Sequence, residues 1–202
     1  MINRNLIALA IVAACIAVAG CSNRKDASAE NLSKAIASEL EGSGPQCYRI
    51  GDLPAEYSVA KMKALEGVPG GPAGLEALAR AGVLSETDTT VKVGKPPGAI
   101  NVPGKRFEWT EAGKKSVSDQ GLLCFGKLAL DKVVSWTPPT STAGAAETIV
   151  TYQYRLEGMP EWAKNPDIQT AYPDIARLVN GAGRTAQRMP LVLTEDGWIS
   201  EK

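Results

Sequence analysis

The chain has 202 residues, with 22 Lys and Arg against 22 Asp and Glu, four cysteines and no histidine. Its length allows one domain or two small ones. The balanced charge lacks the basic surplus that nucleic-acid binding needs, so we expect no nucleic-acid partner. The absence of histidine excludes Ser-His-Asp and Cys-His catalysis and any His-ligated metal site. We expect neither a metal nor a cofactor.

The first twenty residues have the pattern of a secretory signal. One positive charge, on Arg4, precedes thirteen consecutive apolar residues over residues 6–18, and small residues follow. An apolar stretch of this length is typical of a signal peptide and is short for a membrane-spanning helix.

The end of this segment, Val18-Ala19-Gly20-Cys21, resembles the lipobox of bacterial lipoproteins. The resemblance implies that residues 1–20 are a signal peptide that is cut before Cys21. It also implies that the Cys21 thiol carries diacylglycerol and that the new amine is acylated, for example with palmitate. Ser22 then implies the periplasmic side of the outer membrane, with the inner membrane or the cell surface as alternatives. A plain signal peptide that ends in a cysteine is the competing interpretation.

A polar segment over residues 21–29 is expected to act as lipid anchor and tether. A mainly helical half should follow over residues 30–120. Its predicted elements are a helix over residues 29–41 capped by Ser28, a helix within 55–65, a loop at 67–74, a short helix at 75–81, a strand at 89–93, a Pro/Gly loop at 94–104, a strand at 106–109 and a helical segment at 110–117.

Part of this half resembles winged-helix domains. Residues 75–84 (LEALARAGVL), the Gly/Pro-rich segment after them and residues 107–114 (FEWTEAGK) match the helix, wing and Leu-Thr-x-x-Gly run, with Trp109 in place of Leu. The resemblance spans residues 75–117. Its recognition helix offers only Glu76 and Arg80 and lacks a basic face, so the resemblance concerns the fold alone.

The second half, residues 121–202, changes to the alternation of β-strands. Strands are predicted at 127–136, 148–156, 184–193 and 198–200, with a helix over 167–180 that is broken or kinked at Pro173. The Asp196-Gly197 pair favours a tight hairpin. The expected class is α+β: a helical N-terminal half, with a winged-helix arrangement as one option, packed with a C-terminal antiparallel sheet that carries one helix.

Two cysteines remain once Cys15 leaves with the signal and Cys21 takes lipid. In an oxidising compartment, Cys47 and Cys124 are expected to form a disulfide that joins the two halves into one body. Two free or catalytic thiols are the alternative.

Few residues have the spacing of a catalytic site, and we expect no catalytic residue. Ser58-Val-Ala-Lys61 matches the S-x-x-K of penicillin-binding enzymes, but an exposed helix face explains it as well. The paired acids Glu195 and Asp196 are better explained by the hairpin turn. Trp162, in a Pro-bounded segment before a helix, either contacts a partner or fixes that segment to the body.

The sequence therefore favours a lipid-anchored envelope protein with a non-catalytic binding role and an envelope protein as partner. The alternative is a cell-wall or glycan hydrolase that uses Asp/Glu or Ser/Lys. The loops at 67–74 and 94–104, together with Trp162, are the candidate contact surfaces.

Overall fold

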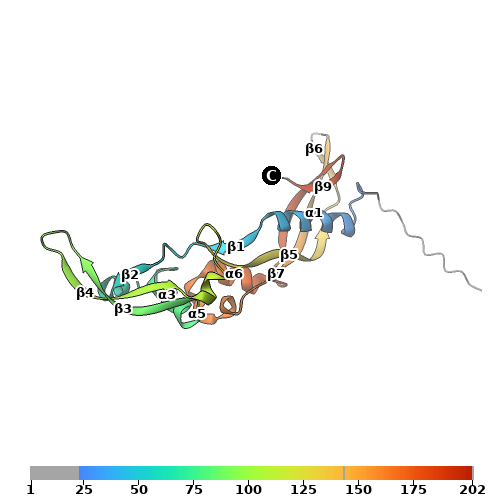
Figure 1. The fold of residues 1–202 in the computed structure, drawn as a ribbon. Helices are drawn as coiled ribbons and strands as arrows, with labels where there is room; N and C mark the ends of the chain where they lie inside the picture. The colour runs from blue at the N-terminus through green and yellow to red at the C-terminus, as the bar shows by residue number, and fades with distance from the viewer. Residues whose placement is uncertain (1–22, 143, 202) are drawn as a thin grey trace, which may run out of the picture.

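A computed structural model describes residues 23–142 and 144–201, so the signal segment, the lipobox and Ser22 lie outside the described residues. The molecule is elongated and consists of two parts, each with its own hydrophobic core (Figure 1). Within the described residues, no helix is both long enough and apolar enough to cross a membrane.

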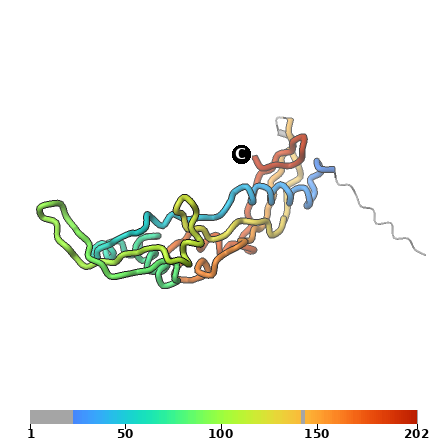
Figure 2. The backbone as a smooth tube through the Cα atoms, in the orientation of Figure 1, coloured from blue at the N-terminus to red at the C-terminus, as the bar shows by residue number. Residues whose placement is uncertain are grey.

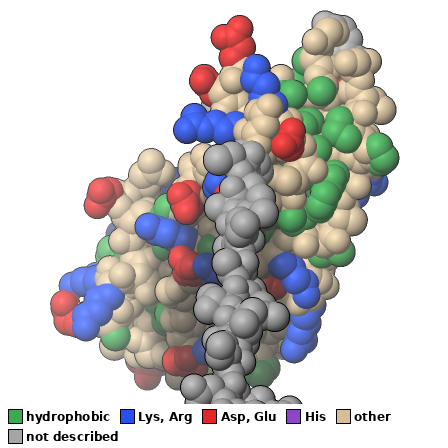
Figure 3. Space-filling model, turned by 90° about the vertical axis from the view of Figure 1, so that its right-hand side faces the viewer, with side chains coloured by type: hydrophobic (Ala, Val, Ile, Leu, Met, Phe, Trp, Pro, Cys, Tyr) green, Lys and Arg blue, Asp and Glu red, His purple; other side chains and the backbone are tan. Residues whose placement is uncertain are grey.

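One part contains the larger sheet, a curled antiparallel sheet of six strands, in the order β1-β5-β7-β8-β9, with β6 also paired to β7. The strands are β1 (Pro45–Tyr48), β5 (Leu123–Trp136), β6 (Thr140–Thr142), β7 (Ala145–Glu157), β8 (Gln187–Thr194) and β9 (Gly197–Ser200). Seen from the end where the described chain begins, this part carries a group of hydrophobic side chains among charged ones (Figure 3).

One helix, α1 (Ala29–Gly42), covers a face of this sheet. Ser28 caps it by accepting a hydrogen bond from the Asn31 N–H at 3.3 Å, as predicted. Leu32, Ile36 and Leu40 are spaced at helical intervals and are buried against apolar residues of β7 and β8. The alternation of β7 supplies that opposite face: Val150, Tyr152 and Tyr154 are buried.

The other part contains the smaller sheet, which has three strands, with helices against it. The strands β2 (Ala55–Ser58), β4 (Ile100–Trp109) and β3 (Leu84–Val93) lie in the order β2-β4-β3. The helices are α2 (Val59–Ala64), α3 (Pro72–Arg80) and α4 (Glu111–Lys114). The β3–β4 hairpin extends beyond the body at the end of the molecule opposite α1 (Figure 2).

Three short helices between β7 and β8 complete this second core: η1 (Glu161–Lys164), α5 (Pro166–Ala171) and α6 (Pro173–Gly181). They pack with α3 and the smaller sheet around Leu78, Phe107, Ile168 and Tyr172, all fully buried. The predicted helix over 167–180 is therefore two helices, with the break at Pro173.

The predicted fold class is wrong: the structure is mostly sheet, and residues 30–120 are not a helical half. Strands account for 40% of the structure and helices for 29%. Residues 55–58 were expected in a helix and residues 100–104 in a loop, and residues 84–88 were assigned to no strand, whereas the strands predicted at 89–93 and 106–109 are present within β3 and β4. The charged residues of the missed segments obscured the strand pattern, yet these side chains pair across the sheet, as in Lys105 with Glu86 at 2.9 Å and Arg106 with Glu56 at 2.7 Å.

The predicted disulfide between Cys47 and Cys124 is confirmed. The two cysteines lie opposite each other in the β1–β5 register, close to where the two parts of the molecule meet. The bond links segments 77 residues apart in the sequence.

Much of the expected tether is in contact with the folded body. The Asn31 side chain donates hydrogen bonds to the carbonyl oxygens of Asn23 at 2.9 Å and Asp26 at 3.0 Å. The Trp198 indole N–H donates to the same Asp26 oxygen at 3.2 Å. Residues 23–28 are thus held between α1 and the β8–β9 hairpin.

Candidate interaction site at the junction

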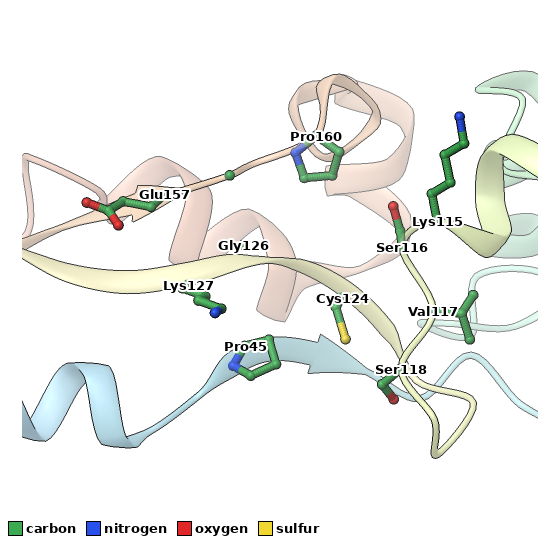
Figure 4. A pocket seen from close by; sticks show the side chains of 11 residues that line it. Pro45, Lys115, Ser116, Val117, Ser118, Cys124, Gly126, Lys127, Glu157 and Pro160 are labelled. Carbon is green, nitrogen blue, oxygen red and sulfur yellow. The ribbon is translucent and has the colours of Figure 1, made fainter.

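A depression of about 420 Å³ lies where the two parts of the molecule meet (Figure 4). Its lining comes from β1, β5, the end of β7 and the segment after α4. The lining residues are Pro45, Lys115, Ser116, Val117, Ser118, Cys124, Gly126, Lys127, Glu157, Gly158 and Pro160.

Backbone contacts hold these segments together. The Cys124 N–H donates to the Ser116 oxygen at 2.7 Å, and Val117 forms an isolated bridge with Leu123. The disulfide ties the same stretch of β5 to β1. The wall of the depression is therefore fixed by sheet pairing and a covalent bond before any ligand arrives, which lowers the entropy cost of binding.

Gly126 allows β5 to approach the end of β7 closely. Its φ of 127° is a backbone conformation that residues with a Cβ rarely adopt. A Cβ at this position would also lie 2.9 Å from the Glu157 carbonyl oxygen. A glycine at this position therefore permits the close approach of the two strands beside the depression.

The charges around the depression are predominantly positive. Glu157 is paired with Arg155 at 2.5 Å. Lys115 and Lys127 form no ion pair with any residue that the structure describes. In Figure 4, Lys127 projects toward Pro45, whereas Lys115 lies at the opposite end of the depression from Glu157. Glu157 lies opposite Lys127 in the β5–β7 register, but its ion pair is with Arg155, so the two lysines leave a positive surplus that favours a ligand with a carboxylate.

Trp162 lies next to the lining of this depression and is not part of it. It is half-buried in η1 and packs against the core of the part that contains the three-stranded sheet. Its indole N–H lies 3.4 Å from the Ser116 hydroxyl, at the limit of a hydrogen bond. Trp162 therefore connects η1 to the segment 115–118, and this arrangement matches the fixing role that the sequence offered as its alternative.

Ser58 and Lys61 have structural contacts of their own. The buried Ser58 hydroxyl caps α2 by accepting a hydrogen bond from the Lys61 backbone N–H at 3.2 Å. The Lys61 ammonium lies 5.3 Å from the centre of the Tyr57 ring, within the range of a cation–π contact. The S-x-x-K spacing is accounted for by helix capping.

Several acidic residues that could be considered for a Glu/Asp catalytic pair have local contacts or positions of their own. Asp167 pairs with Arg80 at 3.3 Å, and Asp174 pairs with Arg177 at the same distance. Glu39 accepts a hydrogen bond from the Ser200 hydroxyl at 2.5 Å. Glu195 and Asp196 form the exposed turn between β8 and β9. Within the described ranges, no group of three or more Cys, Asp or Glu side chains is arranged to hold a metal.

The two candidate contact loops differ in their surroundings. The predicted loop at 67–74 is loop only over residues 67–71, because α3 begins at Pro72, and it is bound to the body through the Gly70 N–H, which donates to the Ala171 carbonyl oxygen at 3.0 Å. Part of the segment 94–104 is strand: residues 100–104 belong to β4, and residues 94–99 form the tip of the β3–β4 hairpin.

The sequence did not reveal the junction depression because four separate segments form it. Gly126 and Gly158, inside or next to strands, were the only local signal, since a glycine in a strand often marks a close backbone approach. Searches of known protein families, curated proteins and solved structures found no match to this chain.

Proposed function

We propose that this chain is a lipid-anchored envelope lipoprotein on the periplasmic side of the outer membrane, and that it acts as a non-catalytic binding module. Acylated Cys21 attaches it to the bilayer, and the junction depression receives an acidic segment of an envelope protein. The anchor rests on the Val18-Ala19-Gly20-Cys21 pattern. The binding role rests on one structural observation, the preformed depression with unpaired amines at Lys115 and Lys127.

The chemistry of the depression suits a short peptide segment. Its apolar surface comes from Pro45, Val117 and Pro160, and backbone groups of Gly126 and Gly158 are accessible next to it. Apolar surface provides the affinity of such a site, and a few polar groups fix the orientation of the ligand. The two lysines would select a carboxylate-bearing segment over a basic one.

The test is a photocrosslinking residue introduced at Ser118, in the wall of the depression, followed by irradiation of intact envelopes. A discrete protein adduct is expected. The double variant Lys115→Glu/Lys127→Glu should lower the adduct yield about tenfold, because two attractive charges become repulsive. Lys63→Glu, an exposed lysine on α2, is the matched control and should leave the yield unchanged.

Two results would contradict the proposal. An adduct that persists in the double variant would show that the depression is not the binding surface. A phenotype lost in Ser58→Ala, with the fold intact by circular dichroism, would instead indicate the Ser/Lys hydrolase, because a binding module does not depend on that hydroxyl.

A further inference from the structure

The outer edge of the smaller sheet is an unpaired β-strand. The order β2-β4-β3 gives β3 a neighbour on one side only. Its ten residues pair with β4 without interruption, from Leu84 opposite Trp109 to Val93 opposite Ile100. Among the described residues, no backbone hydrogen bond from outside the sheet reaches residues 85–93. An edge strand of this kind is a template for a further strand.

Two of the three usual protections of an edge strand are absent from β3, and the third, charge, is present as Glu86, Asp88 and Lys92. Natural edges are shielded by proline, by bulges or by charged side chains. The β3 strand contains no proline and no register shift, and Thr89, Thr90, Val91 and Val93 have the β-branched side chains that strands favour. Val93 and Ile100, paired near the tip, are 43% and 62% exposed. Near the end of the strand Lys92 is the one charged residue, and a residue of opposite charge, Asp88, lies four positions earlier.

Pro103 defines which backbone groups of β3 point outward. It lies opposite Thr90, and a strand proline turns its nitrogen away from the ladder because it has no N–H to donate. Thr90 is therefore at a non-hydrogen-bonded position relative to β4, and its N–H and C=O face the free edge. By alternation, the same holds for Asp88 and Lys92.

We propose that a second copy of this chain pairs with β3 in antiparallel orientation, with Thr90 opposite the partner's Thr90. Twofold symmetry then brings Asp88 opposite the partner's Lys92 at two equivalent places. The same register sets Thr89 opposite the partner's Val91, which matches β-branched residues across the new ladder. The contact is self-complementary and closes as a dimer.

The charges favour this register over its nearest competitor. A pairing centred on Thr89 would bring Glu86, instead of Asp88, opposite the partner's Lys92. The Glu86 side chain is 27% exposed and is held by Lys105 at 2.9 Å. The Asp88 side chain also contacts Lys105, at 2.8 Å, but is 89% exposed, so its carboxylate is accessible to a second amine.

The test is sedimentation velocity of the full chain in detergent over a series of protein concentrations. A monomer–dimer equilibrium is expected. Lys92→Asp and Asp88→Lys should each raise the dimer dissociation constant about thirtyfold, because both copies then present like charges opposite each other. An equimolar mixture of the two variants should dimerise again, because the two chains then carry opposite charges at both positions.

A crosslinking measurement keeps the proposal testable if a charge variant folds poorly. Thr90→Cys should form dimers with a short bismaleimide. Thr87→Cys should not, because the two copies of that position lie about 20 Å apart along the strands in this register. The parent chain contains all the cysteines of the variants except the introduced one, so it measures the background crosslinking. Three results would overturn the proposal: a monomer at all concentrations, a dimer dissociation constant that is the same in the parent chain and the charge variants, or equal crosslinking at both positions.

Discussion

Tyr172 is fully buried, and its hydroxyl has no hydrogen-bond partner among the described residues. Its ring packs edge-on against Tyr48, with centroids 5.2 Å apart. A Cβ at Gly74 would lie 2.7 Å from the Tyr172 hydroxyl oxygen, so the glycine of α3 makes room for this group. The hydroxyl therefore loses its hydration on folding, without the compensation that buried polar groups usually find.

We predict that Tyr172→Phe raises the free energy of unfolding by about 1 kcal/mol, because it keeps the packing and removes an unsatisfied polar group. Urea denaturation of the variant and the parent chain provides the measurement. Tyr172→Ala is the contrasting variant and should lower the free energy of unfolding by about 3 to 5 kcal/mol through the cavity it creates. A clear loss of stability in Tyr172→Phe would show that the hydroxyl has a partner.

The same residue makes the free energy of unfolding decrease at alkaline pH. Burial raises the pKa of Tyr172 above the model-compound value of 10.0. The unfolded chain therefore releases this proton at a lower pH than the folded chain. Ionisation of Tyr172 therefore leaves the free energy of unfolding unchanged below about pH 10 and lowers it as the pH rises from there toward the raised pKa. In Tyr172→Phe this part of the decline should be absent.

At the scale of elements, the disulfide fixes β1 to β5 beside the junction depression. We predict that Cys47→Ala/Cys124→Ala lowers the free energy of unfolding by about 4 kcal/mol, since the bond closes a long loop in the unfolded chain. In the parent chain both thiols should resist alkylation until a reductant is added. Rapid alkylation of both without a reductant would contradict the bond.

The elements that sequence reasoning recovered are those with a local signal. Ser28 and a helical stripe defined α1, the alternation around Val150 defined β7, Pro173 defined the helix break, and Asp196-Gly197 defined the last hairpin. Each of these signals lies within a few residues of the feature it specifies.

The elements that were missed depend on long-range pairing. The first half of β3, around Glu86 and Asp88, is polar and has no apolar alternation, and it becomes a strand because β4 offers Lys105 opposite. Strand β1 pairs with a segment more than seventy residues away, as the separation of 77 between its cysteine and Cys124 shows. The junction depression was missed for the same reason: none of its four segments forms it alone.

At the scale of the whole molecule, the anchor can be tested independently of the binding site. We predict that Cys21→Ser abolishes incorporation of labelled fatty acid and partitioning into the detergent phase. Cys15→Ser is the matched control, since Cys15 leaves with the signal peptide in our interpretation, and it should change neither measurement. Unchanged membrane partitioning of Cys21→Ser would contradict the lipobox.

The contacts of residues 23–28 have a consequence for a chain acylated at Cys21. Two residues from Cys21 to Asn23 span at most about 7 Å, and from Asp26 onward the chain is fastened to Asn31 and Trp198. The linker between the lipid and the folded body of such a protein is very short. The body can tilt and rotate about its attachment point, but it stays close to the lipid surface. The β3–β4 hairpin lies at the far end of the molecule. If the chain is acylated as we propose, the distance that it reaches from the lipid surface is therefore set by the length and tilt of its folded body and not by a flexible linker.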